Sequence, residues 1–94
     1  MDTKINIEEM TVDLRKLGFQ VEEGKKPDEI LITKTYTKGK VCCELNSNKS
    51  FTEYLINNNN TKSFYCYGLY GKNNTPKEIV HSLEDDFRGR SRFL

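Results

Sequence analysis

Apolar residues near the start of the chain recur at the spacing of a helix. They fall three, four and three residues apart, the pattern of one helical face, at Ile7, Met10, Leu14 and Leu17. Asn6 is a suitable N-cap, and Gly18 suits the left-handed position that ends many helices. The pattern predicts a helix over about residues 6–17.

The pattern then changes to an alternation of period two, which is typical of strands. In residues 30–36, isoleucine and tyrosine alternate with leucine and threonine, and β-branched residues dominate. Lys38 and Gly39 predict a tight reversal, after which Val41, Cys43 and Leu45 alternate on a returning strand. These residues predict an antiparallel hairpin.

The segment from residue 51 to residue 56 fits two structures. Its threonine, tyrosine and isoleucine favour a strand. Residues 50–53 also fit a helical capping box, and Phe51 and Leu55 have the i,i+4 spacing of a helical pair. A run this short favours the strand, and the helix stays open as an alternative.

Residues 64–70 form the strongest strand pattern of the chain. Alternation places on one side Phe64, Cys66, Gly68 and Tyr70, and on the other side Tyr65, Tyr67 and Leu69. One of these sets belongs to the core. The other set exposes two tyrosines and a leucine, unless something covers them.

A second helix follows the last strand. Thr75 is its expected N-cap, Pro76 suits the first helical position, and Glu78 completes a capping box. Its apolar face consists of Ile79, Val80, Leu83 and Phe87. We expect this helix to fray near Gly89 and to leave a basic tail over residues 89–94.

The resulting order predicts an α+β fold. An antiparallel meander of three to five strands is packed by an N-terminal and a C-terminal helix, in a single domain of the αβββα type over residues 1–94. Hydrophobic residues make up 35% of the chain, enough for one face of a sheet and two helix stripes. The other sheet face meets water unless a partner covers it.

The charge excludes two classes of protein. The net charge is +1, with a net of −3 over residues 1–30 and +4 over residues 31–94. This balance fits neither a strongly basic nucleic-acid binder nor an acidic nucleic-acid mimic. An apolar run long enough for a membrane span and a secretory leader are both absent from the sequence, and three cysteines are an odd number for a disulfide framework. We therefore expect reduced thiols and a location in a bacterial cytoplasm.

The residue types that carry catalysis are sparse. His81 is the single histidine, and a cysteine–histidine pair needs it beside a thiol and a third orienting group. Cys42 and Cys43 are neighbours on a strand, so their side chains point to opposite faces and do not suit one zinc ion. We expect no enzymatic activity, no metal site and no cofactor.

Tyrosine is the distinctive residue of the predicted sheet. With lysines of neighbouring turns and arginines of the tail, it gives the candidate binding residues Lys34, Tyr36, Lys38, Tyr65, Tyr67, Leu69, Tyr70, Arg88, Arg90 and Arg92. Three interpretations stay open. The tyrosines are half-buried strand residues, they form a protein interface, or they stack on nucleic-acid bases beside lysines.

The layout resembles that of small phage and prophage proteins of low-GC bacteria, including anti-CRISPR and other anti-defence inhibitors. The resemblance spans the whole chain, with a first helix ending in Arg-Lys-Leu-Gly-Phe and a last helix opening with Thr-Pro-Lys-Glu-Ile. It implies a small inhibitor that occludes a surface of a host protein or nucleoprotein. Double-stranded-RNA-binding domains have a similar element order but carry a lysine cluster where this chain has Lys77 alone. A nucleic-acid-binding module and a homo-oligomer, such as a homodimer, are the alternatives.

Overall fold

The computed structural model describes residues 6–71 and 73–94. The elements follow in the order α1 (Ile7–Lys16), β1 (Gln20–Glu23), β2 (Glu29–Tyr36), β3 (Gly39–Asn46), β4 (Ser50–Asn57), β5 (Lys62–Leu69), α2 (Pro76–Arg90) and the 3₁₀ turn η1 (Ser91–Phe93). The strands form one antiparallel meander in the order β1-β2-β3-β4-β5. The expected α+β fold is confirmed, and five strands are the upper end of the expected range. Neither helix has the length and apolar character of a membrane span.

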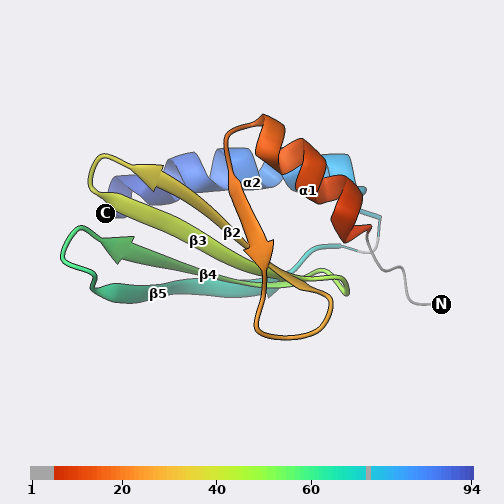
Figure 1. Cartoon of the computed structure of the whole chain (residues 1–94), viewed down its shortest axis with the longest axis horizontal. Helices are drawn as coiled ribbons and strands as arrows, with labels where there is room; N and C mark the ends of the chain where they lie inside the picture. The colour runs from red at the N-terminus through yellow and green to blue at the C-terminus, as the bar shows by residue number, and fades with distance from the viewer. Residues whose placement is uncertain (1–5, 72) are drawn as a thin grey trace.

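Both helices lie on the same side of the sheet (Figure 1). Their apolar stripes pack against every second residue of the strands, which makes one continuous core. The core residues of β3 are Val41, Cys43 and Leu45, and all three are fully buried. Phe87 of α2 is fully buried too, and its ring meets the Phe19 ring edge-on with centroids 5.1 Å apart. Among residues 6–71 and 73–94, no helix covers the far side of the sheet.

Helix α1 begins and ends where the sequence predicts. The Asn6 side chain accepts a hydrogen bond from the Glu9 N–H. At the other end Gly18 has φ +91°, and the N–H of Phe19 reaches back to the Leu14 carbonyl at 3.1 Å. This is the Schellman arrangement, which glycine adopts without strain.

The ambiguous segment is a strand. β4 pairs with β3 on one side and with β5 on the other, so sheet partners on both sides satisfy its backbone. Glu53 and Leu55 face the core, and their neighbours Thr52, Tyr54 and Ile56 face the other way. The hydrogen bonds of two hairpin ladders outweigh a local capping pattern.

β5 departs from simple alternation. Glu53 pairs with Cys66 and Tyr54 pairs with Phe64, so Tyr65 is an extra residue in a β-bulge. The predicted alternation was therefore wrong at two positions. Phe64 lies on the same side as Tyr67 and Leu69, and Tyr65 turns to the helix side, where its ring lies 5.7 Å from that of Phe93.

Helix α2 begins as predicted and ends later. Thr75 and Glu78 form a reciprocal capping box. The helix continues through Gly89 to Arg90, one residue past the expected position, and passes into η1. Leu94 packs against the core beyond η1, which places the basic residues 89–94 on the helix side of the sheet.

Candidate open-face interface

The sheet face away from the helices is the surface that the fold leaves uncovered. We call it the open face. Its residues on β2 to β5 include Leu31, Thr33, Thr35, Lys40, Cys42, Glu44, Thr52, Tyr54, Ile56, Lys62, Phe64, Tyr67 and Leu69. They alternate with the buried residues of the same strands, so the register that buries the core also fixes this set.

Three large side chains of β5 project from the open face into solvent. Phe64 is 61% exposed, Tyr67 76% and Leu69 70%. The rings of Phe64 and Tyr67 lie against each other with centroids 5.8 Å apart, an arrangement that the bulge at Tyr65 makes possible. We call these three residues the β5 strip. A contiguous exposed apolar group of this kind marks interaction surfaces.

The centre of the open face is flatter and partly closed. The Lys62 ammonium lies 4.2 Å from the centroid of the Tyr54 ring, a cation–π contact. Beneath them Cys42 is buried, and Thr33 Oγ1 lies 3.9 Å from its sulfur. Burial raises the pKa of the Cys42 thiol, and burial together with Cys42 raises the pKa of Tyr54 to about 12. Both groups are therefore neutral at physiological pH.

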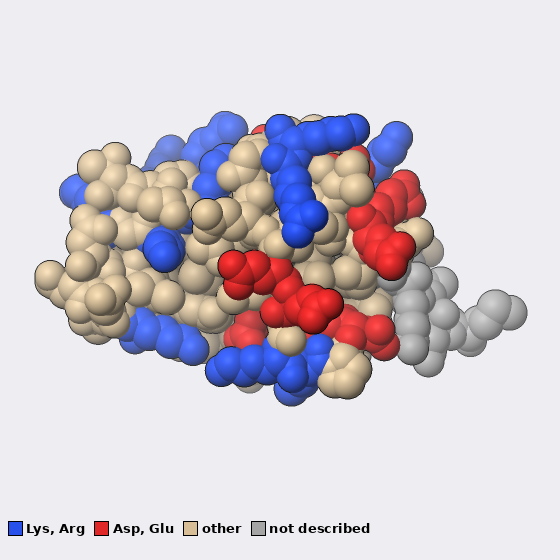
Figure 2. All heavy atoms as spheres, viewed as in Figure 1, with Lys and Arg blue, Asp and Glu red and all other residues tan. Residues whose placement is uncertain are grey.

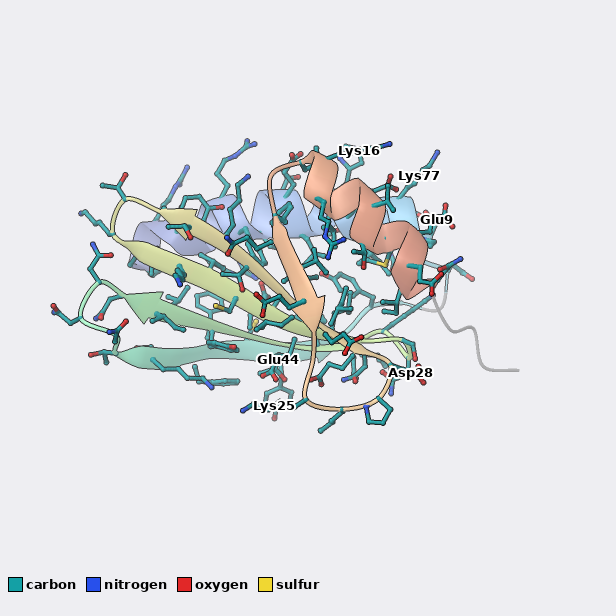
Figure 3. All side chains as sticks on the ribbon, viewed as in Figure 1. Glu9, Lys16, Lys25, Asp28, Glu44 and Lys77 are labelled. Carbon is teal, nitrogen blue, oxygen red and sulfur yellow. The ribbon has the colours of Figure 1, made fainter. Side chains whose placement is uncertain are left out.

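Acidic and basic side chains of the open face lie at different positions along the strands. Glu44 projects from the sheet on the side away from both helices (Figure 3). Lys40 lies four residues back along the same strand, about 13 Å away at the rise of a strand. Acidic side chains also gather over β1, the orange arrow of Figure 1, as Figure 2 shows. On β3 itself, Lys40 and Glu44 thus lie toward opposite ends of the strand.

Only part of the predicted set lies on this surface. Tyr67 and Leu69 belong to the open face. Tyr36 and Tyr70 are half-buried against the core on the helix side, and the Tyr70 ring lies 4.7 Å from the ring of Phe51. Lys34 is on the helix side too, with its ammonium 4.9 Å above the Phe19 ring.

The predicted basic residues do not join the exposed tyrosines. Lys38 is exposed in the turn between β2 and β3, and Arg88 and Arg92 are exposed on α2 and η1. Arg90 lies 4.5 Å above the centroid of the Tyr65 ring. The structure therefore separates the arginines from the open face by the thickness of the sheet.

Sequence reasoning missed Phe64, the partner of Tyr67. The alternation of residues 64–70 assigns it to the core, and the inserted residue at position 65 reverses that assignment. Lys62 and Tyr54 were also left out of the candidate set, although cross-strand neighbours on β4 and β5 are the expected contacts in a hairpin.

A second group of chemical interest lies under the end of α2. Glu53 is 1% exposed, and its Oε1 accepts a hydrogen bond from the Cys66 thiol at 3.2 Å and pairs with Arg90 at 3.5 Å. Burial raises the pKa of Glu53, and burial with the Glu53 contact raises the pKa of Cys66. A raised thiol pKa is the opposite of nucleophile activation, which favours a structural role.

The remaining side chains that could carry catalysis or bind a metal do not cluster with one another. His81 is exposed in a shallow groove between the two helices, with Asp13, Lys16 and Lys77 among its neighbours. Within residues 6–71 and 73–94, the structure groups no three His, Cys, Asp or Glu side chains as a metal site.

Comparison with known proteins adds no relative: no protein-family model, curated protein or solved structure matches the chain. The open face is therefore interpreted from its own geometry.

Proposed function

We propose that the chain is a small non-enzymatic binding protein that inhibits or modulates a larger host protein or nucleoprotein by covering part of its surface. The observation that carries this proposal is the β5 strip, in which Phe64, Tyr67 and Leu69 are exposed side by side on an edge strand. Aromatic and large aliphatic side chains supply most of the energy at the centre of protein interfaces.

The surroundings of the β5 strip favour a protein partner. Tyr54, Thr52 and Ile56 extend the surface across β4, and single charges such as Lys62 lie around it. An apolar centre with a polar rim is the usual composition of a protein interface. Because the open face carries both positive and negative charges, its electrostatic field can orient a protein partner but does not strongly attract a polyanion such as DNA or RNA.

The biological setting follows from the same proposal. In size, layout and richness in lysine and asparagine, the chain resembles the phage or mobile-element inhibitors of low-GC bacteria, such as anti-CRISPR proteins, although its near-neutral charge differs from the strongly acidic members of that class. The site of action is then the cytoplasm of the bacterial host. Occlusion through the open face suits this role because it needs no catalytic group.

Nucleic-acid binding is the second candidate. The stacked Phe64 and Tyr67 rings and the Lys62–Tyr54 contact resemble a platform for single-stranded bases. Glu44 lies on the same face, and Arg88 and Arg92 belong to elements on the other side of the sheet. This distribution gives a weak electrostatic footprint for phosphates.

Site-specific photo-crosslinking tests the proposal. A photo-crosslinking phenylalanine replaces Tyr67 in one preparation and His81, on the helix side, in another, and each is irradiated in a low-GC bacterial lysate. We expect a crosslinked protein from position 67 and not from position 81. The double variant Phe64→Ser, Leu69→Ser should lose this adduct, whereas Val12→Ser, an exposed apolar control on α1, should keep it.

Two results would argue against a protein partner. Identical adducts from positions 67 and 81 would mean that the capture does not depend on the open face. Adducts to RNA or DNA that vanish as salt rises would instead support the nucleic-acid candidate.

A further inference from the structure

We propose that the open face, when no other partner covers it, is covered by a second copy of this chain in a two-fold symmetric dimer. This inference goes beyond the proposed function and does not depend on it, because it concerns the isolated chain. It rests on the order of charged and apolar residues across the open face, which the strand register sets.

The register arranges most of the open face in three rows that run across the strands, and Leu69, paired with Ser50, lies beyond the third of them. The basic row is Thr35, Lys40, Ile56 and Lys62. The middle row is Thr33, Cys42, Tyr54 and Phe64. The acidic row is Leu31, Glu44, Thr52 and Tyr67. The middle row is uncharged and separates the two charged rows.

Charge selects one of the two simple ways to stack two such faces. With the two-fold axis parallel to the strands and over the central strand β3, each row meets its own copy, so Glu44 approaches Glu44 and Lys40 approaches Lys40. With the axis along the middle row, the basic and acidic rows exchange places. Glu44 of one copy then faces Lys40 of the other, twice by symmetry.

The same axis also pairs the apolar residues. Phe64 and Tyr54 in the middle row meet their own copies, and Tyr67 approaches Lys62 of the second copy. Two sheets packed face to face in this way form an aligned sandwich. The three exposed side chains of the β5 strip become part of its interior or its border.

The two charges are available for this contact. Glu44 and Lys40 have no ion-pair partner within the described part of the chain. Their separation of about 13 Å along β3 prevents them from pairing within one copy. A second copy supplies each with an opposite charge.

The edges of the sheet are less suited to self-association. At β1, the Arg15 guanidinium donates to the Val21 carbonyl at 2.9 Å and occupies an acceptor that an added strand would need. At β5, the bulge at Tyr65 and the charge of Lys62 interrupt a regular ladder. Bulges and edge lysines are devices that prevent edge pairing. The face is therefore the better surface for a second copy.

Charge exchange tests the dimer in the purified full-length chain. Sedimentation equilibrium from low micromolar to millimolar concentration should show a monomer–dimer equilibrium. Glu44→Lys and Lys40→Glu should each raise the dissociation constant by about tenfold or more, because each places like charges face to face twice. The double variant carrying both substitutions should recover most of the affinity.

Controls separate this effect from general changes. Lys77→Glu changes one charge on the helix side and should leave the dissociation constant unchanged (Figure 3). Far-UV circular dichroism reports whether each variant is folded.

Three results would overturn the inference: a wild-type chain that stays monomeric at the highest concentration, a dimer indifferent to both single variants, or a double variant as weak as the single ones. None of them bears on capture of a host protein, which the crosslinking at position 67 measures separately.

Discussion

On the covered face of β3, Val41, Cys43 and Leu45 meet the helices and lose contact with solvent, whereas Lys40 and Glu44 of the same strand lie on the face that no helix covers. The two faces share one backbone and one set of hydrogen bonds. The two faces differ in whether helices pack against them. One face has two apolar helix stripes, and the other has none, so its apolar residues remain available to a partner (Figure 1).

Because of this difference, separate sets of residues determine the stability of the fold and the binding of a partner. Residues of the covered face hold the fold together, and the exposed residues of the open face can change with little cost to it. Substitutions that compare matched positions on the two faces therefore test whether the separation is real.

Two phenylalanines give the largest contrast. Phe87→Ala removes a fully buried ring from the core and should lower the free energy of unfolding by about 3–5 kcal/mol. Phe64→Ala removes an exposed ring and should change it by no more than about 0.5 kcal/mol. Urea denaturation at low protein concentration, where the chain is monomeric, measures both. Similar losses for the two variants would show that the open face is part of the core.

Two glycines give a smaller contrast. A Cβ at Gly68 would lie 2.8 Å from Cζ of Phe51, so Gly68→Ala should cost about 1–3 kcal/mol of stability. A Cβ at Gly89 in α2 meets nothing within 4 Å, and Gly89→Ala should stabilise the helix by about 0.5–1 kcal/mol. Thermal unfolding of the two variants should shift the midpoint in opposite directions. A neutral Gly68→Ala would mean that the Phe51 ring moves aside freely.

Two glutamates give the smallest contrast, which is visible in the pH dependence of stability. Burial raises the pKa of Glu53 above 4.5, so its stabilising contribution is complete below that pH and is lost as pH rises through the folded-state pKa. Hydrogen bonds from Thr75 lower the pKa of Glu78, so its contribution is present above pH 4.5 and is lost as pH falls. Glu53→Gln and Glu78→Gln should therefore change the slope of stability against pH in opposite senses.

The groups around Glu53 belong to several elements and need control in this measurement. Cys43 lies on β3, Cys66 on β5, and Asp86 and Arg90 on α2, while Tyr70 follows β5 with a buried hydroxyl. Urea denaturation at a series of pH values between about 4 and 8 covers the expected window. The prediction for Glu53 fails if Glu53→Gln leaves the pH profile of the wild type unchanged.

Local patterns in the sequence were sufficient for the helices and hairpins. The Asn6 cap, the Gly18 terminus and the Thr75–Glu78 capping box depend on residues within one turn of each other, and all three are present. The ambiguity at residues 51–56 needed more information. Pairing with the strands before and after it, β3 and β5, decides it, and residues 51–56 alone do not contain that information.

The candidate interface was predictable only in part, for the same reason. Tyr67 and Leu69 follow from the alternation of β5. The faces on which Phe64 and Tyr65 lie do not follow from that alternation, because the bulge arises from the pairing between β4 and β5. The Glu53–Arg90 pair likewise required α2 to continue past Gly89, where a glycine in the sequence suggests an end.

The bulge at Tyr65 also has an evolutionary consequence. In a regular strand, residues three apart in sequence project from opposite faces, so Phe64 and Tyr67 are neighbours because one extra residue lies between them in β5. Loss of the codon for Tyr65 would leave Phe64 paired with Tyr54 and Lys62 paired with Ile56, so a regular β5 that is one residue shorter would present the same open face. The bulge therefore lets β5 carry one additional residue, Tyr65, on the helix side without changing which side chains the open face presents.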